Sequence, residues 1–260
     1  MDLDFTISKY QKLCEALQKQ YSTRTIYEYL TKYQTSQAAK SNKPNLKLIV
    51  LRHDVDRKIV NALRMAELEH DLGIRSSYYF RYPYTFEPEI IAQIQSLGHE
   101  VGYHYETLSE AKGDVARAMA LFEEGLSAFR DICDVNTICM HGNVLSRYDN
   151  RDLWRTNDMG TYGILGEASL SVQNAVYFTD TGRNWNSNSN IRDTVKNSKV
   201  YHSVSTTDEL IRYLESSQDQ IVYINAHPER WAIHLSDWMK TLIKSRVFNI
   251  GKRIILIARS

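Results

Sequence analysis

The stretch that decides the fold is Leu46-Lys-Leu-Ile-Val-Leu51, followed directly by Arg52-His-Asp-Val-Asp56. The apolar run predicts a short strand buried on both faces, as in a parallel sheet. Two carboxylates, Asp54 and Asp56, come where this strand ends, and the carboxyl ends of parallel strands are where such folds place their chemistry. Asp54 has a second reading, as the N-cap of a helix predicted over residues 58–71. A cap accounts for one carboxylate and leaves the rest of the cluster unexplained.

Predicted strands and helices alternate along the chain after this point. Helical spacing of apolar residues predicts helices over 58–71, 86–97, 115–130 and 208–216, and β-rich runs predict strands over 76–81, 99–104, 136–140, 175–179 and 220–225. Such alternation predicts an α/β fold with a parallel sheet, open or rolled into a barrel. We expect one domain over residues 1–260, in which residues 1–45 form a helical N-terminal extension packed on the barrel.

The charge balance excludes several classes of partner. Lys and Arg number 32 against 31 Asp and Glu, a net charge of +1, and no basic block occurs, so neither nucleic acid nor an anionic membrane is expected as a partner. The start, residues 1–5, lacks the basic and apolar regions of an export signal, and no run of about 18 apolar residues occurs. Three cysteines without a CxxC spacing indicate reduced, buried thiols. We therefore expect a cytoplasmic protein with no integral membrane segment.

Polar side chains suited to metal or proton chemistry follow several of the predicted strands. They are Asp54, Asp56, His104, Glu106, His141, Asp180 and His227. In a parallel α/β barrel all of these strand ends face one rim. Carboxylates and imidazoles bind Zn²⁺ and similar divalent ions, and a catalytic site leaves one coordination position open for water. A metal-activated water beside a general base is the arrangement of a hydrolase.

The order of these motifs resembles the polysaccharide deacetylase superfamily, the NodB-like enzymes of carbohydrate esterase family 4, over about residues 52–231. The motifs are the strand ending in Asp-Val-Asp56, Gly98-His-Glu-Val-Gly-Tyr-His104, His141, Asp180 with Trp185, and His227-Pro228. The branch it resembles most has the DxD first motif and includes proposed deacetylases of O-antigen and other surface polysaccharides. The resemblance implies a distorted (β/α) barrel with fewer strands than a full eightfold one. It also implies removal of an N-acetyl or N-formyl group from an amino sugar, dependent on a divalent metal.

The resemblance also assigns roles to individual residues. Asp54 would be the general base, and Asp56 would be a metal ligand. His104 matches the first metal-binding histidine of the family, whereas His99 in the same motif is assigned a structural role. His227 matches the late histidine that protonates the leaving amine. One divalent ion, Zn²⁺ in the first place, is the expected cofactor.

Two departures from the family pattern leave alternatives open. The family has a further histidine four residues after His104, and here that position is Leu108. The third ligand then comes from His141 or Glu106, of which we favour His141. The family's arginine that orients the base is also missing near His141. Its replacement would be Arg52, Arg81 or Arg183.

Supporting residues are expected in the loops beyond the strand ends. Asn143 follows the fourth predicted strand, and Asp180 is expected to orient the acid and keep its imidazole charged. Arg183 and Trp185 are candidates for a wall that binds the sugar ring, and Arg230 is a further candidate. The other reading of these residues is an ordinary packed loop.

Three classes of function remain open from the sequence. The first is a hydrolase of an acetylated amino sugar in a surface-polysaccharide precursor, with the sugar attached to a nucleotide or a lipid. The second is a hydrolase of another amide or ester on the same scaffold. The third is a carbohydrate-binding barrel that has lost catalysis, a reading motivated by Leu108. The N-terminal helices either close the bottom of the barrel or form a homodimer interface.

Overall fold

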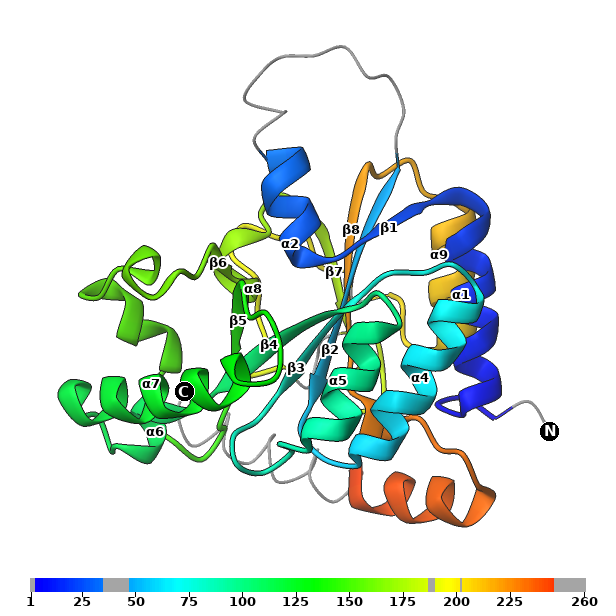
Figure 1. Ribbon diagram of the computed structural model, residues 1–260. Helices are drawn as coiled ribbons and strands as arrows, with labels where there is room; N and C mark the ends of the chain where they lie inside the picture. Colours follow the sequence, from blue (N-terminus) through cyan, green and yellow to red (C-terminus); the bar gives the residue numbers. More distant parts are fainter. Residues whose placement is uncertain (1–2, 35–46, 187–189, 202, 246–260) are drawn as a thin grey trace.

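The computed structural model describes residues 3–34, 47–186, 190–201 and 203–245, and its centre is a parallel sheet that curls into an incomplete barrel (Figure 1). The strand order is β6-β5-β4-β3-β2-β8-β7. The strands are β2 Leu48–Val55, β3 Ser77–Phe80, β4 Glu100–Tyr105, β5 Thr137–Met140, β6 Gly166–Glu167, β7 Val176–Thr179 and β8 Ile221–Ala226. Each pair in this order is parallel, which confirms the predicted distorted (β/α) barrel.

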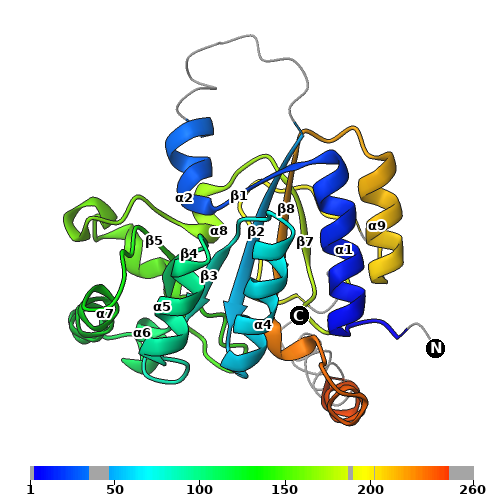
Figure 2. The same ribbon diagram turned by 45° about the vertical axis from the view of Figure 1, so that its right-hand side comes forward.

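Long helices cover the outer face of the sheet. They are α1 Ile7–Gln20, α4 Ile59–Asp71, α5 Pro88–Ser96, α7 Val115–Arg130 and α9 Thr207–Ser216. In α7 the buried Phe122, Leu126 and Phe129 recur at helical spacing, so one face of the helix packs on the sheet and the other meets solvent. Figure 2 shows α1 beside α9 on the β7–β8 side of the molecule, where their contacts place them.

The N-terminal segment, predicted to be a helical extension, contains a short strand as well as helical turns. Strand β1, Ser22–Arg24, pairs with the beginning of β2 and was missed. The helical turns that follow, α2 Ile26–Glu28 and η1 Tyr29–Gln34, insert Ile26 and Leu30 among the residues of the barrel interior. These turns therefore close the interior at the amino ends of the strands, at the end of the barrel opposite the predicted site.

Most predicted elements occur within about two residues of their expected bounds. Besides β1, the short elements β6, α6 Thr107–Glu110 and α8 Ala168–Ser171 were missed. Helix α4 begins after Lys58, which adopts φ 49° and makes no side-chain cap, so the reading of Asp54 as its cap is wrong. The three cysteines are free and buried, as expected. Among the described helices, none combines the length and the apolarity needed to cross a membrane.

Strand β2 divides its side chains between two environments. Val50 lies with the interior cluster, whereas Ile49 and Leu51 pack against the outer helices. This alternation follows from the two-residue period of a strand. It sends Arg52 and Asp54 toward the barrel interior.

Candidate active site

A cavity of about 340 Å³ opens at the carboxyl ends of the strands. Its lining includes all five residues that the sequence assigns to catalysis or metal binding, namely Asp54, Asp56, His104, His141 and His227. They come from β2, β4, β5 and β8 or from the residues directly after these strands. The volume lies within the usual range of small-molecule sites, roughly 300–1,000 Å³.

Three of these residues form a compact group. Asp56 Oδ1 lies 3.4 Å from His104 Nε2 and 3.4 Å from His141 Nε2. The three ligand atoms all lie within 4.8 Å of one another. A carboxylate with two imidazoles is a ligand set used by catalytic zinc sites.

Hydrogen bonds on the far side of each imidazole determine which nitrogen faces Asp56. His104 Nδ1 donates to the carbonyl oxygen of Cys139 at 3.0 Å, and His141 Nδ1 donates to Glu106 Oε2 at 2.8 Å. Because both acceptors are oxygens without protons, each Nδ1 bears the proton and each Nε2 keeps its lone pair. Metal-binding histidines are oriented in this way by an outer carboxylate or carbonyl.

The residues present fit a divalent cation. Asp56 Oδ1 is buried and has no hydrogen-bond partner among the described residues. An ionised oxygen without a donor, facing two imidazole lone pairs, is satisfied by a cation.

Glu106 lies behind His141 and does not belong to the ligand group. Besides the His141 ring it accepts a hydrogen bond from Asn143 Nδ2 at 2.6 Å, and it forms an ion pair with Arg81. Asn143, predicted as a supporting residue, thus acts through Glu106. Leu108, where the family has its further histidine, is buried in the outer core. Of the two candidates for the third ligand, His141 is therefore the better placed.

The carboxylate of Asp54 is held by two donors. Arg52 Nη2 lies 3.0 Å from Asp54 Oδ2, and Asn225 Nδ2 donates to the same oxygen at 2.9 Å. Of the three arginines considered as partners of the base, Arg52 is the one that contacts it. Arg81 pairs with Glu106, and Arg183 lies over the rings of Phe5 and Trp238.

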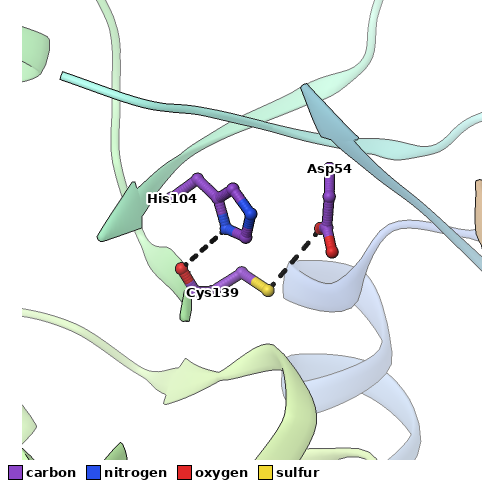
Figure 3. A group of neighbouring side chains, drawn as sticks. All are labelled: Asp54, His104 and Cys139. Atoms are coloured by element: carbon purple, nitrogen blue, oxygen red, sulfur yellow. Dashed lines mark hydrogen bonds between the residues drawn. The ribbon is translucent and has the colours of Figure 1, made fainter. Parts of the chain in front are cut away.

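A second group of metal-binding atoms overlaps the first. Asp54, His104 and Cys139 also bring one ligand atom each within 4.8 Å, and the Cys139 thiol donates to Asp54 Oδ1 at 3.6 Å (Figure 3). Burial raises the pKa of this thiol well above its ordinary value. Because Asp54 already accepts hydrogen bonds from Arg52 and Asn225, the group around Asp56 fits a cation better.

Asp193 is a site residue that sequence reasoning missed. It lines the cavity from the long connection after β7, and it accepts hydrogen bonds from Arg52, Tyr177, Thr179, Thr181 and Asn225. Burial raises the pKa of the Asp193 carboxyl, but its partners, chiefly Arg52, outweigh burial and hold this pKa far below its ordinary value. Arg52 and Asn225 thus donate hydrogen bonds to both Asp193 and Asp54. No local sequence signal marks it.

His227 faces Asp54 across the cavity and is bound to Asp180 from behind. Its Nε2 lies 4.0 Å from Asp54 Oδ2, and its Nδ1 lies 2.7 Å from Asp180 Oδ1. Burial and the neighbouring Arg230 lower the pKa of His227, but Asp180 outweighs them and raises it to about 9. The imidazole is therefore charged at neutral pH. Arg230 Nη1 also donates to Asp180, at 2.6 Å, and this arginine lines the cavity.

Trp185 and Arg183 do not form the expected wall for a sugar ring. Trp185 is fully buried, donates its indole N–H to Thr207 at 3.1 Å and packs against Phe5. Neither Trp185 nor Arg183 lines the cavity. The packed-loop reading of this segment agrees with these positions.

No family model matches the chain, and no curated protein matches it. Several solved structures are similar to it. A Streptococcus mutans CE4 esterase is 13% identical with a TM-score of 0.48, covering 85% of this chain and 87% of that one. The catalytic domain of a peptidoglycan N-acetylglucosamine deacetylase from Eubacterium rectale is 14% identical with a TM-score of 0.45, covering 81% and 90%.

A CE4 family pseudoenzyme from Bacillus anthracis is 13% identical with a TM-score of 0.42 and 81% of this chain covered. This chain spans less than two thirds of that protein, 63% of the wild-type chain and 65% of a mutant with restored activity. CE4 is the carbohydrate esterase family that the sequence motifs resemble.

Proposed function

We propose that the protein is a metal-dependent hydrolase that removes an N-acyl group, in the first place N-acetyl, from an amino sugar. The observation that supports this best is the unpaired Asp56 Oδ1 facing the Nε2 atoms of His104 and His141. Asp54 and a charged His227 line the same cavity. A ligand set, a base and an acid are what amide hydrolysis by this class of enzyme requires.

Asp56, His104 and His141 would hold the ion, and Zn²⁺ suits this mixed carboxylate and imidazole set. When bound, the ion supplies Lewis acidity toward the acyl carbonyl and lowers the pKa of a water molecule. The outer partners of the two imidazoles, Glu106 and the Cys139 carbonyl, keep both Nε2 atoms directed at the same point.

Asp54 is the general base of the proposed reaction. Its carboxylate accepts the proton of the attacking water, while Arg52 and Asn225 keep it in one orientation. Asp193 holds both donors in turn.

His227 is the general acid. With Nδ1 bound to Asp180, the proton available for transfer is the one on Nε2, the nitrogen nearer Asp54. It passes to the leaving nitrogen as the carbon–nitrogen bond breaks. Without this proton the leaving group would be an amide anion, which is too basic to depart.

The substrate we propose is an acetylated amino sugar attached to a nucleotide or a lipid carrier, as in cytoplasmic assembly of O-antigen or another surface polysaccharide. Arg57, Lys58 and Lys244 are exposed residues of the cavity lining, in a chain with a net charge of only +1. The four acidic residues of the lining, Asp54, Asp56, Asp193 and Glu229, are the ones that form the inner site. A phosphate of the carrier would complement the basic mouth.

The test combines metal content with turnover on the purified, untagged protein. Protein loaded with Zn²⁺, Co²⁺ or Mn²⁺ is incubated with N-acetylated and N-formylated amino sugars, free and phosphate-linked, and released acetate or formate is measured. We expect about one ion per chain and release that falls by about 10²- to 10⁴-fold in Asp54→Asn. Absence of bound metal after reconstitution, or release from simple esters and no N-acyl sugar, would overturn the proposal.

A further inference from the structure

Glu229 lines the same cavity and has no role in the chemistry above. It lies in the short η4 turn Pro228–Arg230, two residues after His227. Its Oε2 atom is buried and has no hydrogen-bond partner among the described residues. A buried carboxylate oxygen without a donor is costly, and native sites seldom keep one without a reason.

The neighbouring cations do not supply the missing donor. Arg230 directs Nη1 to Asp180, and the ring of His227 is bound to the same carboxylate.

The expected metal ion does not explain Glu229 either. Among the described residues, the compact groups of ligand atoms are Asp56 with His104 and His141, and Asp54 with His104 and Cys139. Glu229 belongs to neither. An O–H or N–H group of a substrate in the cavity would supply the donor that Oε2 lacks among the described residues.

We propose that Glu229 is a specificity residue that accepts a hydrogen bond from an O–H or N–H group of the sugar undergoing deacylation. This inference rests on the proposed function. It adds which chemical group of the substrate the site would recognise. A carboxylate repels a phosphate, and it cannot form a hydrogen bond with the acyl carbonyl oxygen, which is also an acceptor. The group that Glu229 would bind is therefore a ring hydroxyl or the amide N–H. Sites that hydrogen-bond such a group discriminate strongly against analogues that lack it.

The experiment combines changes of the Glu229 side chain with changes of single groups on the substrate. Glu229→Ala and Glu229→Gln are compared with wild type on N-acetylated amino sugars and on two kinds of analogue. One kind replaces a single ring hydroxyl with hydrogen, and the other replaces the amide N–H with an ester oxygen. Glu89→Ala, at an exposed position of α5, is the matched control.

We expect Glu229→Ala to lower kcat/KM about tenfold or more on the parent sugar, and to have little effect on the one analogue that lacks the donor. Glu229→Gln, which keeps an acceptor oxygen, should lose less. Metal content should equal that of wild type in both variants. A variant that loses metal, or one as active and as selective as wild type on every sugar, would overturn the assignment.

Binding separates failure of this inference from failure of the proposed function. Calorimetric titration of the same sugars into metal-loaded Asp54→Asn, with and without Glu229→Ala, needs no turnover. Binding that weakens with Glu229→Ala for the parent sugar but not for the analogue supports Glu229 even if the reaction differs. Equal binding with and without the change refutes the inference alone. No binding of any acylated sugar refutes both.

Discussion

Asp180 holds His227 through two hydrogen bonds at once. Its Oδ1 accepts from the imidazole Nδ1 at 2.7 Å, and its Oδ2 accepts from the backbone N–H of the same residue at 2.9 Å. Asp180 is fully buried and also accepts from the indole of Trp231. The position and the charge of the proposed acid thus depend on one carboxylate.

The first prediction concerns the pH dependence of Asp180→Asn. Because the pKa of His227 is raised to about 9, wild-type activity should persist below that pH and fall above it as the acid loses its proton. Without the Asp180 charge, burial and Arg230 lower the pKa of the imidazole, so the alkaline fall should move to lower pH. A profile of kcat/KM against pH measures this shift. Asp71→Asn, at an exposed position, should leave the profile in place.

The second prediction concerns the metal ligands. His104→Ala and His141→Ala should each abolish stoichiometric metal binding, as measured by plasma mass spectrometry after dialysis. His70→Ala, at an exposed position of α4, is the control and should keep the ion. Full metal content in His141→Ala would show that this imidazole is not a ligand.

Glu106→Gln tests the outer partner of His141. The glutamine can still accept from Nδ1, but it lacks the charge that makes the imidazole a stronger ligand. We expect metal affinity to fall by about 10- to 100-fold, without complete loss. Competition with a chelator of known affinity measures the change. An unchanged affinity would mean that the charge of Glu106 does not act on the ion through His141.

Asp54→Asn separates the base from the ligands. The variant should keep its metal and its folded state, because Asp54 lies outside the group of Asp56, His104 and His141. Its kcat should fall by about 10²- to 10⁴-fold, as expected for loss of a general base. Metal content and single-turnover rates are measured on the same preparation. Loss of metal in this variant would instead favour the overlapping group that contains Cys139.

The last prediction concerns stability and a buried network on the outer face of β2. Glu69 is fully buried and accepts from His53, Tyr10, Ser76 and Tyr78. Burial raises the pKa of Glu69, but its partners, chiefly His53, outweigh burial and lower this pKa from 4.5 to about 2. The depressed pKa contributes stability above pH 4.5 that is lost as the pH falls toward 2, on the order of 3 kcal/mol.

Glu69→Gln should therefore lower the free energy of unfolding at pH 7 and narrow its difference between pH 7 and pH 3. Urea unfolding at both pH values measures the two quantities. Glu67→Gln, at a more exposed position of the same helix, should change neither by more than about 0.5 kcal/mol. Equal pH dependence in Glu69→Gln and wild type would contradict the assignment of the shift to Glu69.

The fold and the inner site were largely predictable because both depend on short-range patterns. Strand ends in a parallel barrel share a rim, so Asp56, His104 and His141 could be placed together from the positions of their strands. Helix bounds followed from apolar spacing, and the structure adds that Asp114 caps the start of α7. The two-residue β6 and the strand β1 are too short to leave such a pattern.

The two site residues that the sequence did not reveal were missed for the same physical reason. Asp193 and Glu229 reach the cavity from a loop and a single turn, where no periodicity fixes the direction of a side chain. The two readings of Trp185 stayed open for a similar reason, because an aromatic residue in a loop can face solvent or the core. Here Phe5 and Trp231 cover it. Only the tertiary arrangement decides between these outcomes.

The alternation along β2 has a consequence for how this protein can be altered. Arg52 and Asp54 serve the cavity, while His53 between them serves the Glu69 network on the opposite face. Inserting or deleting one residue in Leu48–Val55 would exchange the two sets, presenting an imidazole to the cavity and a carboxylate to Glu69. The effects of point substitutions in this strand can therefore vary in size, whereas a change of one residue in its length should abolish folding and activity together.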